Sequence, residues 1–126
     1  MILEGKSVVV CGVGPGLGRE VAQAALRDGA NVVIGARSQD KLEATAKELD
    51  PSGTRIAAIP VDITDTARCT AFLDEAAKRF GGVDAVVQVA AFDTQMGTLA
   101  TTSEEDWQTC LNANVIGTMC IAKAAL

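Results

Sequence analysis

Glycine is concentrated in one short stretch near the start of the chain. The stretch contains Gly12, Gly14, Gly16 and Gly18, with Leu17 between the last two. Glycine lets a chain turn sharply and approach a pyrophosphate closely, and a helix that follows offers unpaired N–H groups at the positive end of its dipole. The stretch lacks the Lys-Ser or Lys-Thr pair that a mononucleotide-binding loop needs. We therefore predict that these five residues bind the phosphates of a dinucleotide, with an ordinary structural turn as the alternative.

The residues that follow the second apolar run bear on which dinucleotide binds. An acid at this point would bind the ribose 2′-hydroxyl of NAD. The chain instead has Arg37 and Ser38, which suit a 2′-phosphate, and its next acid is Asp40. NADP is therefore favoured over NAD, although a solvated arginine at a strand end is the alternative. After the third run, Asp62 and Ile63 are expected beside the adenine ring, unless Asp62 only begins the next turn.

Four short apolar runs must position these residues, and amphipathic stretches separate the runs. We predict buried strands at residues 7–11, 31–36, 55–61 and 85–90. The first helix starts at Leu17 and is expected to bury Leu17, Val21, Ala24 and Ala25. Thr64 is expected to cap the third helix, and Ser103 with Asp106 to open a last helix that continues to the end of the chain. This alternation predicts an α/β domain with a mainly parallel sheet and helices on both faces.

Composition limits the classes of function. The formal net charge is −5 and no cluster of basic residues occurs, which argues against nucleic-acid binding. The chain has no histidine, and its four cysteines lack metal-binding spacing, so no metal site is expected. The cysteines are interpreted as reduced core residues, with a redox role as the alternative. No secretory signal and no apolar run of membrane-spanning length is present, so we expect a cytoplasmic protein.

Several segments resemble the short-chain dehydrogenase/reductase family. They are Cys11-Gly12-x-x-x-Gly16-Leu17-Gly18, Ala36-Arg37, Val61-Asp62-Ile63-Thr64, Gly82-x-Asp84, Trp107 and Asn114-Val115-x-Gly117. The resemblance extends along the whole chain. It implies a Rossmann-type, doubly wound sheet over residues 1–126, with its four strands in the order 3-2-1-4. It also implies an oxidoreductase that transfers a hydride between NAD(P) and a small-molecule alcohol or carbonyl substrate.

The chain departs from the family pattern at two places near the cofactor. Cys11 replaces the usual threonine before the first glycine. The family's Asn-Asn-Ala-Gly after the fourth strand corresponds to Gln88-Val89-Ala90-Ala91, in which only Ala90 matches. By the resemblance, Ala90 contacts the cofactor, and Gln88 replaces part of the lost asparagine hydrogen bonding.

The family's catalytic set is represented here by one residue. That set comprises an Asn, a Ser and a Tyr-x-x-x-Lys pair, and Asn114 matches the Asn; the alternative is that Asn114 is only a polar helix residue. The sequence contains no tyrosine and stops at Leu126, before the Ser and the Tyr-x-x-x-Lys pair would occur. We therefore expect a truncated, cofactor-binding portion of a longer enzyme that is inactive by itself. A non-catalytic dinucleotide-binding module, acting as a sensor or regulator, is the alternative.

The fourth strand would form an exposed apolar edge, which favours pairing with another segment. Either the C-terminal part of a longer chain or another chain is expected to cover it. The resemblance also implies a homo-oligomer formed through the last helix.

Overall fold

The computed structural model describes residues 1–94 and 96–126 of the chain. Its centre is a sheet of β1 (Ser7–Cys11), β2 (Asn31–Ala36), β3 (Ile56–Pro60) and β4 (Ala85–Gln88). The strands lie in the order β3-β2-β1-β4, and each neighbouring pair is parallel. The strand order therefore changes direction between β1 and β4, where sheets of this kind open a crevice beyond the carboxyl ends of the strands. The predicted Rossmann-type sheet is confirmed.

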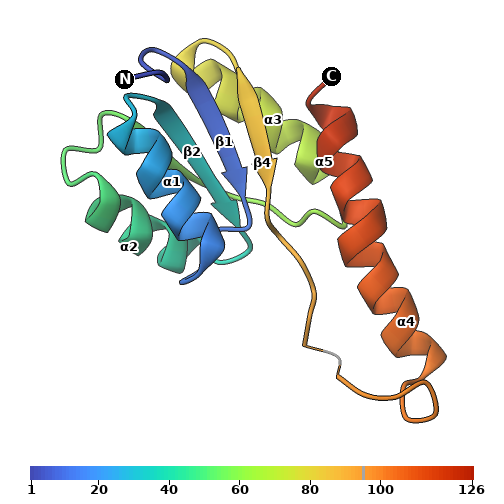
Figure 1. Cartoon of the computed structure of the whole chain (residues 1–126). Helices are drawn as coiled ribbons and strands as arrows, with labels where there is room; N and C mark the ends of the chain where they lie inside the picture. The colour runs from blue at the N-terminus through green and yellow to red at the C-terminus, as the bar shows by residue number, and fades with distance from the viewer. Residues whose placement is uncertain (95) are drawn as a thin grey trace.

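Helices cover both faces of the sheet (Figure 1). On one face lie α1 (Leu17–Arg27) and α2 (Gln39–Leu49), and on the other lie α3 (Thr66–Phe80) and α5 (Thr118–Ala124). A further helix, α4 (Glu104–Leu111), extends away from the sheet and joins α5 through the π-helical turn η1 (Asn112–Gly117). No helix within the described ranges is both long enough and apolar enough to cross a membrane.

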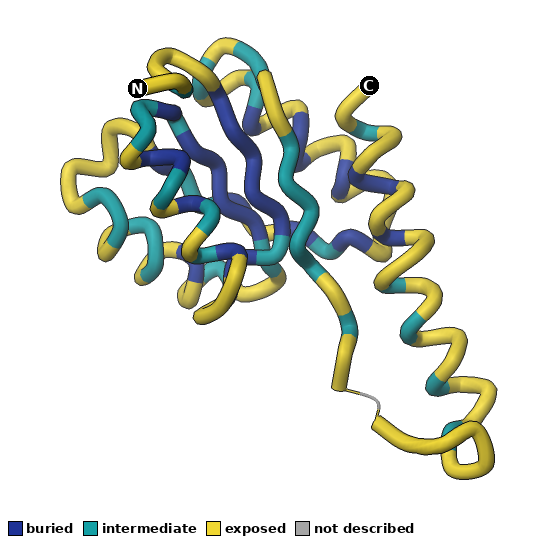
Figure 2. The backbone as a smooth tube through the Cα atoms, viewed as in Figure 1, coloured by how far each residue is buried: buried dark blue, intermediate teal, exposed yellow. Residues whose placement is uncertain are grey.

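The two halves of the core are separated by the sheet. In β1, Val8 and Val10 pack toward α1 and α2, whereas Val9 and Cys11 pack toward α3 and α5. This alternation follows from the strand period of two, and burial on both faces explains why β1 is continuously apolar. Figure 2 shows buried strands at the centre and a largely exposed α4 with the loop before it.

The predicted inner face of α1 is wrong by one residue. The spacing is as expected, but the side that faces the sheet consists of Gly18, Ala22, Ala25 and Leu26. The reason is that Gly18 lies directly against the glycine turn, where a Cβ atom would stand 2.3 Å from the carbonyl oxygen of Gly12. Leu17 is consequently turned outward and is 67% exposed.

Some predicted element boundaries also need correction. β3 begins at Ile56 and ends at Pro60, one residue shorter at each end than predicted. β4 ends at Gln88, because the N–H groups of Val89 and Ala90 both donate to the carbonyl oxygen of Cys11. Thr64 does not cap α3. Asp65 does, accepting a hydrogen bond from the N–H of Arg68, while the Thr64 hydroxyl is bonded to Asp62.

The last helix is not continuous. Ser103 and Asp106 form the expected capping box, with each side chain bonded to the other residue's N–H. The helix then widens into η1, where a Cβ atom at Gly117 would stand 2.8 Å from the side chain of Ile63. The π turn thus occurs where the chain is held closely against the segment that follows β3.

Two polar side chains join elements that are distant in sequence. The Asp84 carboxylate accepts a 2.8 Å hydrogen bond from the N–H of Ser7 and a 3.2 Å bond from the Lys6 ammonium group. The Arg55 guanidinium donates to the carbonyl oxygens of Leu26 and Ala30, at 2.8 and 3.2 Å. These bonds satisfy backbone groups at the start of β1 and at the end of α1.

Candidate functional site

The glycine turn between β1 and α1 is fixed by the strands on both sides. The N–H groups of Gly12 and Val13 donate to the carbonyl oxygen of Gly35 in β2, at 2.7 and 3.0 Å. On the other side, the N–H groups of Val89 and Ala90 donate to the carbonyl oxygen of Cys11. Gly12 has a φ of +102°, and a Cβ atom there would stand 2.1 Å from the backbone nitrogen of Ala90. No side chain other than hydrogen fits at this position.

The outer part of the same turn has room on its open side. Cβ atoms built on Gly14 and Gly16 would meet nothing within 4 Å. Gly16 is the N-cap of α1, and no side chain caps the helix. The N–H groups of Arg19 and Glu20 donate to the Gly16 carbonyl oxygen, whereas those of Leu17 and Gly18 have no backbone partner among the described residues. These two N–H groups lie at the positive end of the helix dipole, in the arrangement that binds phosphate groups.

A cavity of about 680 Å³ lies above this turn, at the carboxyl ends of the strands. It brings together nine of the residues that the sequence predicts as a cofactor site. They are Gly12, Gly14, Gly16, Leu17, Gly18, Arg37, Asp62, Ile63 and Ala90. Leu17, which is turned outward, is one of the lining residues. Gly12 and Gly18 shape the turn itself, while Gly14 and Gly16 leave space over it.

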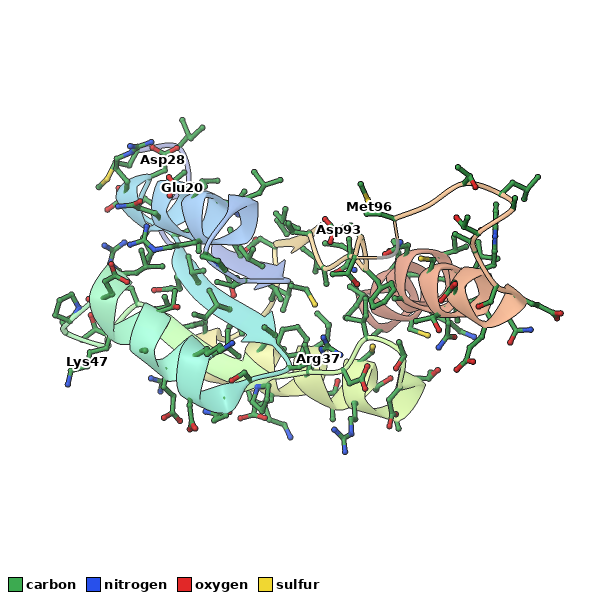
Figure 3. The ribbon with its side chains drawn as sticks, turned by 90° about the horizontal axis from the view of Figure 1, so that it is seen from below. Glu20, Asp28, Arg37, Lys47, Asp93 and Met96 are labelled. Atoms are coloured by element: carbon green, nitrogen blue, oxygen red, sulfur yellow. The ribbon has the colours of Figure 1, made fainter. Side chains whose placement is uncertain are left out.

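Arg37 and Asp62 lie at the end of the cavity that β2 and β3 form. Arg37 is exposed just beyond β2, as Figure 3 shows in a view onto the carboxyl ends of the strands. The Asp62 carboxylate accepts bonds from the Thr64 hydroxyl and N–H, at 2.6 and 3.0 Å. These bonds, with a smaller contribution from the charges of Arg37 and Arg68, lower the pKa of Asp62 below its usual value. This end of the cavity therefore carries one cation beside a fixed carboxylate.

Two predicted site residues do not line the cavity. Ser38 is the N-cap of α2, and its side chain makes no capping hydrogen bond. Asn114 lies in η1, where its amide bonds twice to the backbone of Phe92. Its Oδ1 accepts from the Phe92 N–H at 2.6 Å, and its Nδ2 donates to the Phe92 carbonyl oxygen at 2.9 Å. Asn114 thus holds the loop that follows β4, and its neighbour Ala113 reaches the cavity.

The cavity lining also contains residues that the sequence did not predict as cofactor-binding. Phe92 and Asp93 line the cavity beyond Ala90, and Thr64 lines it beyond Asp62. An irregular loop carries no periodicity, so nothing in the sequence distinguishes Asp93 from other exposed acids. Gln88 donates from its amide nitrogen to the Ala90 carbonyl oxygen at 3.1 Å, which braces the start of this segment.

Cys11, Cys69 and Cys120 are core residues. Cys11, Cys69 and Cys120 are buried, and Cys110 is half-buried. Burial raises the pKa of the Cys11 thiol to about 12 and that of Cys69 to about 11, with smaller contributions from neighbouring groups. Both thiols are therefore protonated at neutral pH, and a thiolate is the form that reacts. Among residues 1–94 and 96–126, no cluster of His, Cys, Asp and Glu side chains is suited to bind a metal ion.

The fold and the cavity define a protein of the Rossmann dinucleotide-binding class, and comparisons with known proteins identify the family. The family model for short chain dehydrogenases matches residues 6–126. An uncharacterized oxidoreductase of Staphylococcus aureus is 30% identical over 125 residues, which are 99% of this chain and 53% of the relative. The chain belongs to the short-chain dehydrogenase family of oxidoreductases, whose members bind NAD(P).

Solved structures agree with this assignment. A short-chain dehydrogenase/reductase of the glucose/ribitol dehydrogenase type from Brucella melitensis superposes with a TM-score of 0.90 at 31% identity, covering 98% of this chain and 51% of that one. An actinorhodin polyketide ketoreductase variant with NADPH superposes with a TM-score of 0.89 at 26% identity, covering 96% and 46%. The chain therefore spans about half the length of the relatives that it matches.

Proposed function

We propose that the chain binds NADP(H) in preference to NAD(H), as the cofactor-binding part of an oxidoreductase that acts on an alcohol or carbonyl substrate. The observation that carries this proposal is the position of Arg37. It follows the last residue of β2, the strand that pairs with β1 beside the glycine turn, and it lines the cavity. In Rossmann domains the ribose of the adenosine half lies at this strand end, and an arginine there accommodates a 2′-phosphate.

The residues present fit a dinucleotide along the whole cavity. The uncapped start of α1 and the open space over Gly14 and Gly16 suit the pyrophosphate. Asp62 and Ile63 line the side where the adenine would lie, and Ala90 lines the opposite side. When it is bound, the nicotinamide supplies or accepts a hydride. The described part of the chain supports that chemistry by holding the dinucleotide and by fixing the loop beyond β4 through Asn114.

The proposal is tested by titrating the chain with NADP(H) and NAD(H). Arg37→Ala should weaken NADP(H) binding about 10- to 100-fold, the usual effect of losing a charge-assisted hydrogen bond, and should leave NAD(H) binding almost unchanged. Arg79→Ala is the matched control, because Arg79 is an exposed arginine of α3 outside this cavity. Equal affinity of the native chain for both cofactors would refute the assignment of Arg37.

We further propose that the 126 residues bind cofactor without turning over substrate. Their sequence contains no tyrosine, the residue that the family uses as general acid and base. A missing general acid or base costs about 10²- to 10⁴-fold in rate. The whole protein's substrate is proposed only at the level of the family, as a small alcohol or carbonyl compound.

We also propose that the chain associates with a second copy of itself. A stripe of apolar side chains runs along α4, η1 and α5, and its members are between 45% and 56% exposed. This stripe consists of Trp107, Leu111, Val115, Ile116 and Met119. Contiguous exposed apolar surface of this kind is typical of a protein–protein interface.

A further inference from the structure

The charged residues that line the cavity are distributed unequally between its two ends. Among the described residues of the lining, the charged ones are Arg37, Asp62 and Asp93. Arg37 and Asp62 lie beyond β2 and β3, whereas Asp93 lies beyond β4. Figure 3 shows Arg37 and Asp93 on different elements at the carboxyl ends of the strands. The β4 end of the cavity therefore carries a single carboxylate, and no cation of the lining lies beside it.

The direction in which a dinucleotide lies follows from the proposed function, on which this inference rests. With the adenosine half beyond β2 and the pyrophosphate at the start of α1, the nicotinamide half must extend toward β4. The residues available at that end run from Val89 to Asp93. A nicotinamide ring bound in this direction would lie on the side of the cavity that carries Asp93.

The backbone that carries Asp93 is held at two points. At its start, the N–H groups of Val89 and Ala90 donate to the carbonyl oxygen of Cys11, at 2.7 and 2.9 Å. One residue before Asp93, both backbone polar groups of Phe92 are bonded to the Asn114 amide. These contacts keep the Asp93 backbone at the cavity lining, although its side chain is exposed.

We propose that Asp93 makes the site selective for the oxidised form of the cofactor. The oxidised nicotinamide ring carries a formal positive charge, and the reduced ring is neutral, whereas the phosphates carry the same charge in both forms. A carboxylate at this end consequently attracts only the oxidised ring and repels the phosphates of both forms equally. Asp93 thus raises the affinity for NADP⁺ relative to NADPH.

The test measures the dissociation constants of NADP⁺ and NADPH by calorimetric titration and takes their ratio. In Asp93→Asn, the preference for NADP⁺ should fall about three- to tenfold, as expected for unit charges several ångströms apart in a partly hydrated site. The ratio cancels effects on the phosphates, which carry the same charge in both forms. The effect of the change in net charge is measured separately with a control variant. Raising the ionic strength should reduce the native preference toward that of the variant.

Two controls separate this effect from general changes in charge or folding. Asp74→Asn removes one charge from the exposed side of α3, outside the cavity, and should leave the ratio unchanged. Asp93→Glu keeps the carboxylate and should retain the preference. If Asp93→Asn binds both forms with the native ratio, or if Asp74→Asn lowers it equally, the inference is overturned. If the native chain binds neither form, the proposed function fails, and this inference fails with it.

Discussion

The four glycines of the turn meet different physical demands. Gly12 and Gly18 face neighbouring backbone at distances that no Cβ atom tolerates, and Gly12 also has a positive φ. Gly14 and Gly16 have neither constraint, since a Cβ atom added at either residue would meet no other atom within 4 Å. The first pair is therefore required by the fold, and the second pair leaves room for a ligand.

Replacing glycines from each pair separates folding from binding. Gly12→Ala should lower the free energy of unfolding by about 2–4 kcal/mol, because the β4 segment must move away from the new methyl group. Gly14→Ala should change it by less than about 0.5 kcal/mol, since the site is open. Urea denaturation followed by circular dichroism measures both. A Gly12→Ala chain as stable as the native one would contradict the close packing described at this turn.

At the residue scale, the motif residues could be predicted from the sequence because glycine and charge at fixed spacing carry chemical meaning. The outward orientation of Leu17 and the place of Asp93 in the cavity lining could not be predicted. Leu17 belongs to an apolar pattern that fits two adjacent faces of a helix, and only the close contact at Gly18 decides between them. Asp93 depends on a loop whose path is set by Asn114, which is distant in sequence.

At the scale of elements, the order and type of helices and strands were predictable from alternating periodicity. The ends of β3 and β4 were not, because backbone bonds to a neighbouring strand decide where each chain leaves the sheet. The π-helical turn was also not predictable, since its residues fit a regular helix. Likewise, nothing local indicates that Arg55 would bond to the carbonyl oxygens at the end of α1.

The contact between Asp84 and the start of β1 is expected to contribute stability that depends on pH. Hydrogen bonds from the Ser7 N–H, then from Lys6, lower the pKa of Asp84 in the folded chain. A folded-state pKa below the unfolded value contributes stability above the unfolded pKa, and this contribution is lost as the pH falls through the folded pKa. Asp84→Asn should therefore lower the melting temperature at pH 7, and this deficit should shrink below about pH 4.

Thermal melts of both chains from pH 7 down to pH 3 measure this dependence. Asp74→Asn serves again as the control, because Asp74 is an exposed acid of α3 to which the structure gives no hydrogen bond among the described residues. If the melting temperature of Asp84→Asn stays below that of the native chain by the same amount across the whole range, the contact stabilises the fold through packing rather than through the charge of Asp84.

At the scale of the whole molecule, the sheet and the last helices leave two apolar surfaces available. β4 is an edge strand in the described part of the chain, with β1 on one side. The stripe on α4, η1 and α5 is separate from the core: α4 buries no residue, and α5 packs on α3 through Cys120 and Ile121, which are not part of the stripe. The stripe is therefore the surface on which we propose that a second copy binds.

A charged substitution in the stripe tests the proposed self-association. Leu111 and Val115 are one helical turn apart and about half exposed, so glutamate at either position keeps the helix solvated while removing apolar contact area. We expect the native chain to sediment as a dimer and both Leu111→Glu and Val115→Glu to shift it at least tenfold toward monomer. That shift corresponds to about 1.4 kcal/mol of association free energy.

Ala44→Glu places the same charge on the exposed side of α2, across the sheet, and should leave the dimer intact. Sedimentation of the native chain as a monomer at every concentration tested would refute the interface, whereas a loss of helical circular dichroism in the stripe variants would show that these side chains serve folding instead.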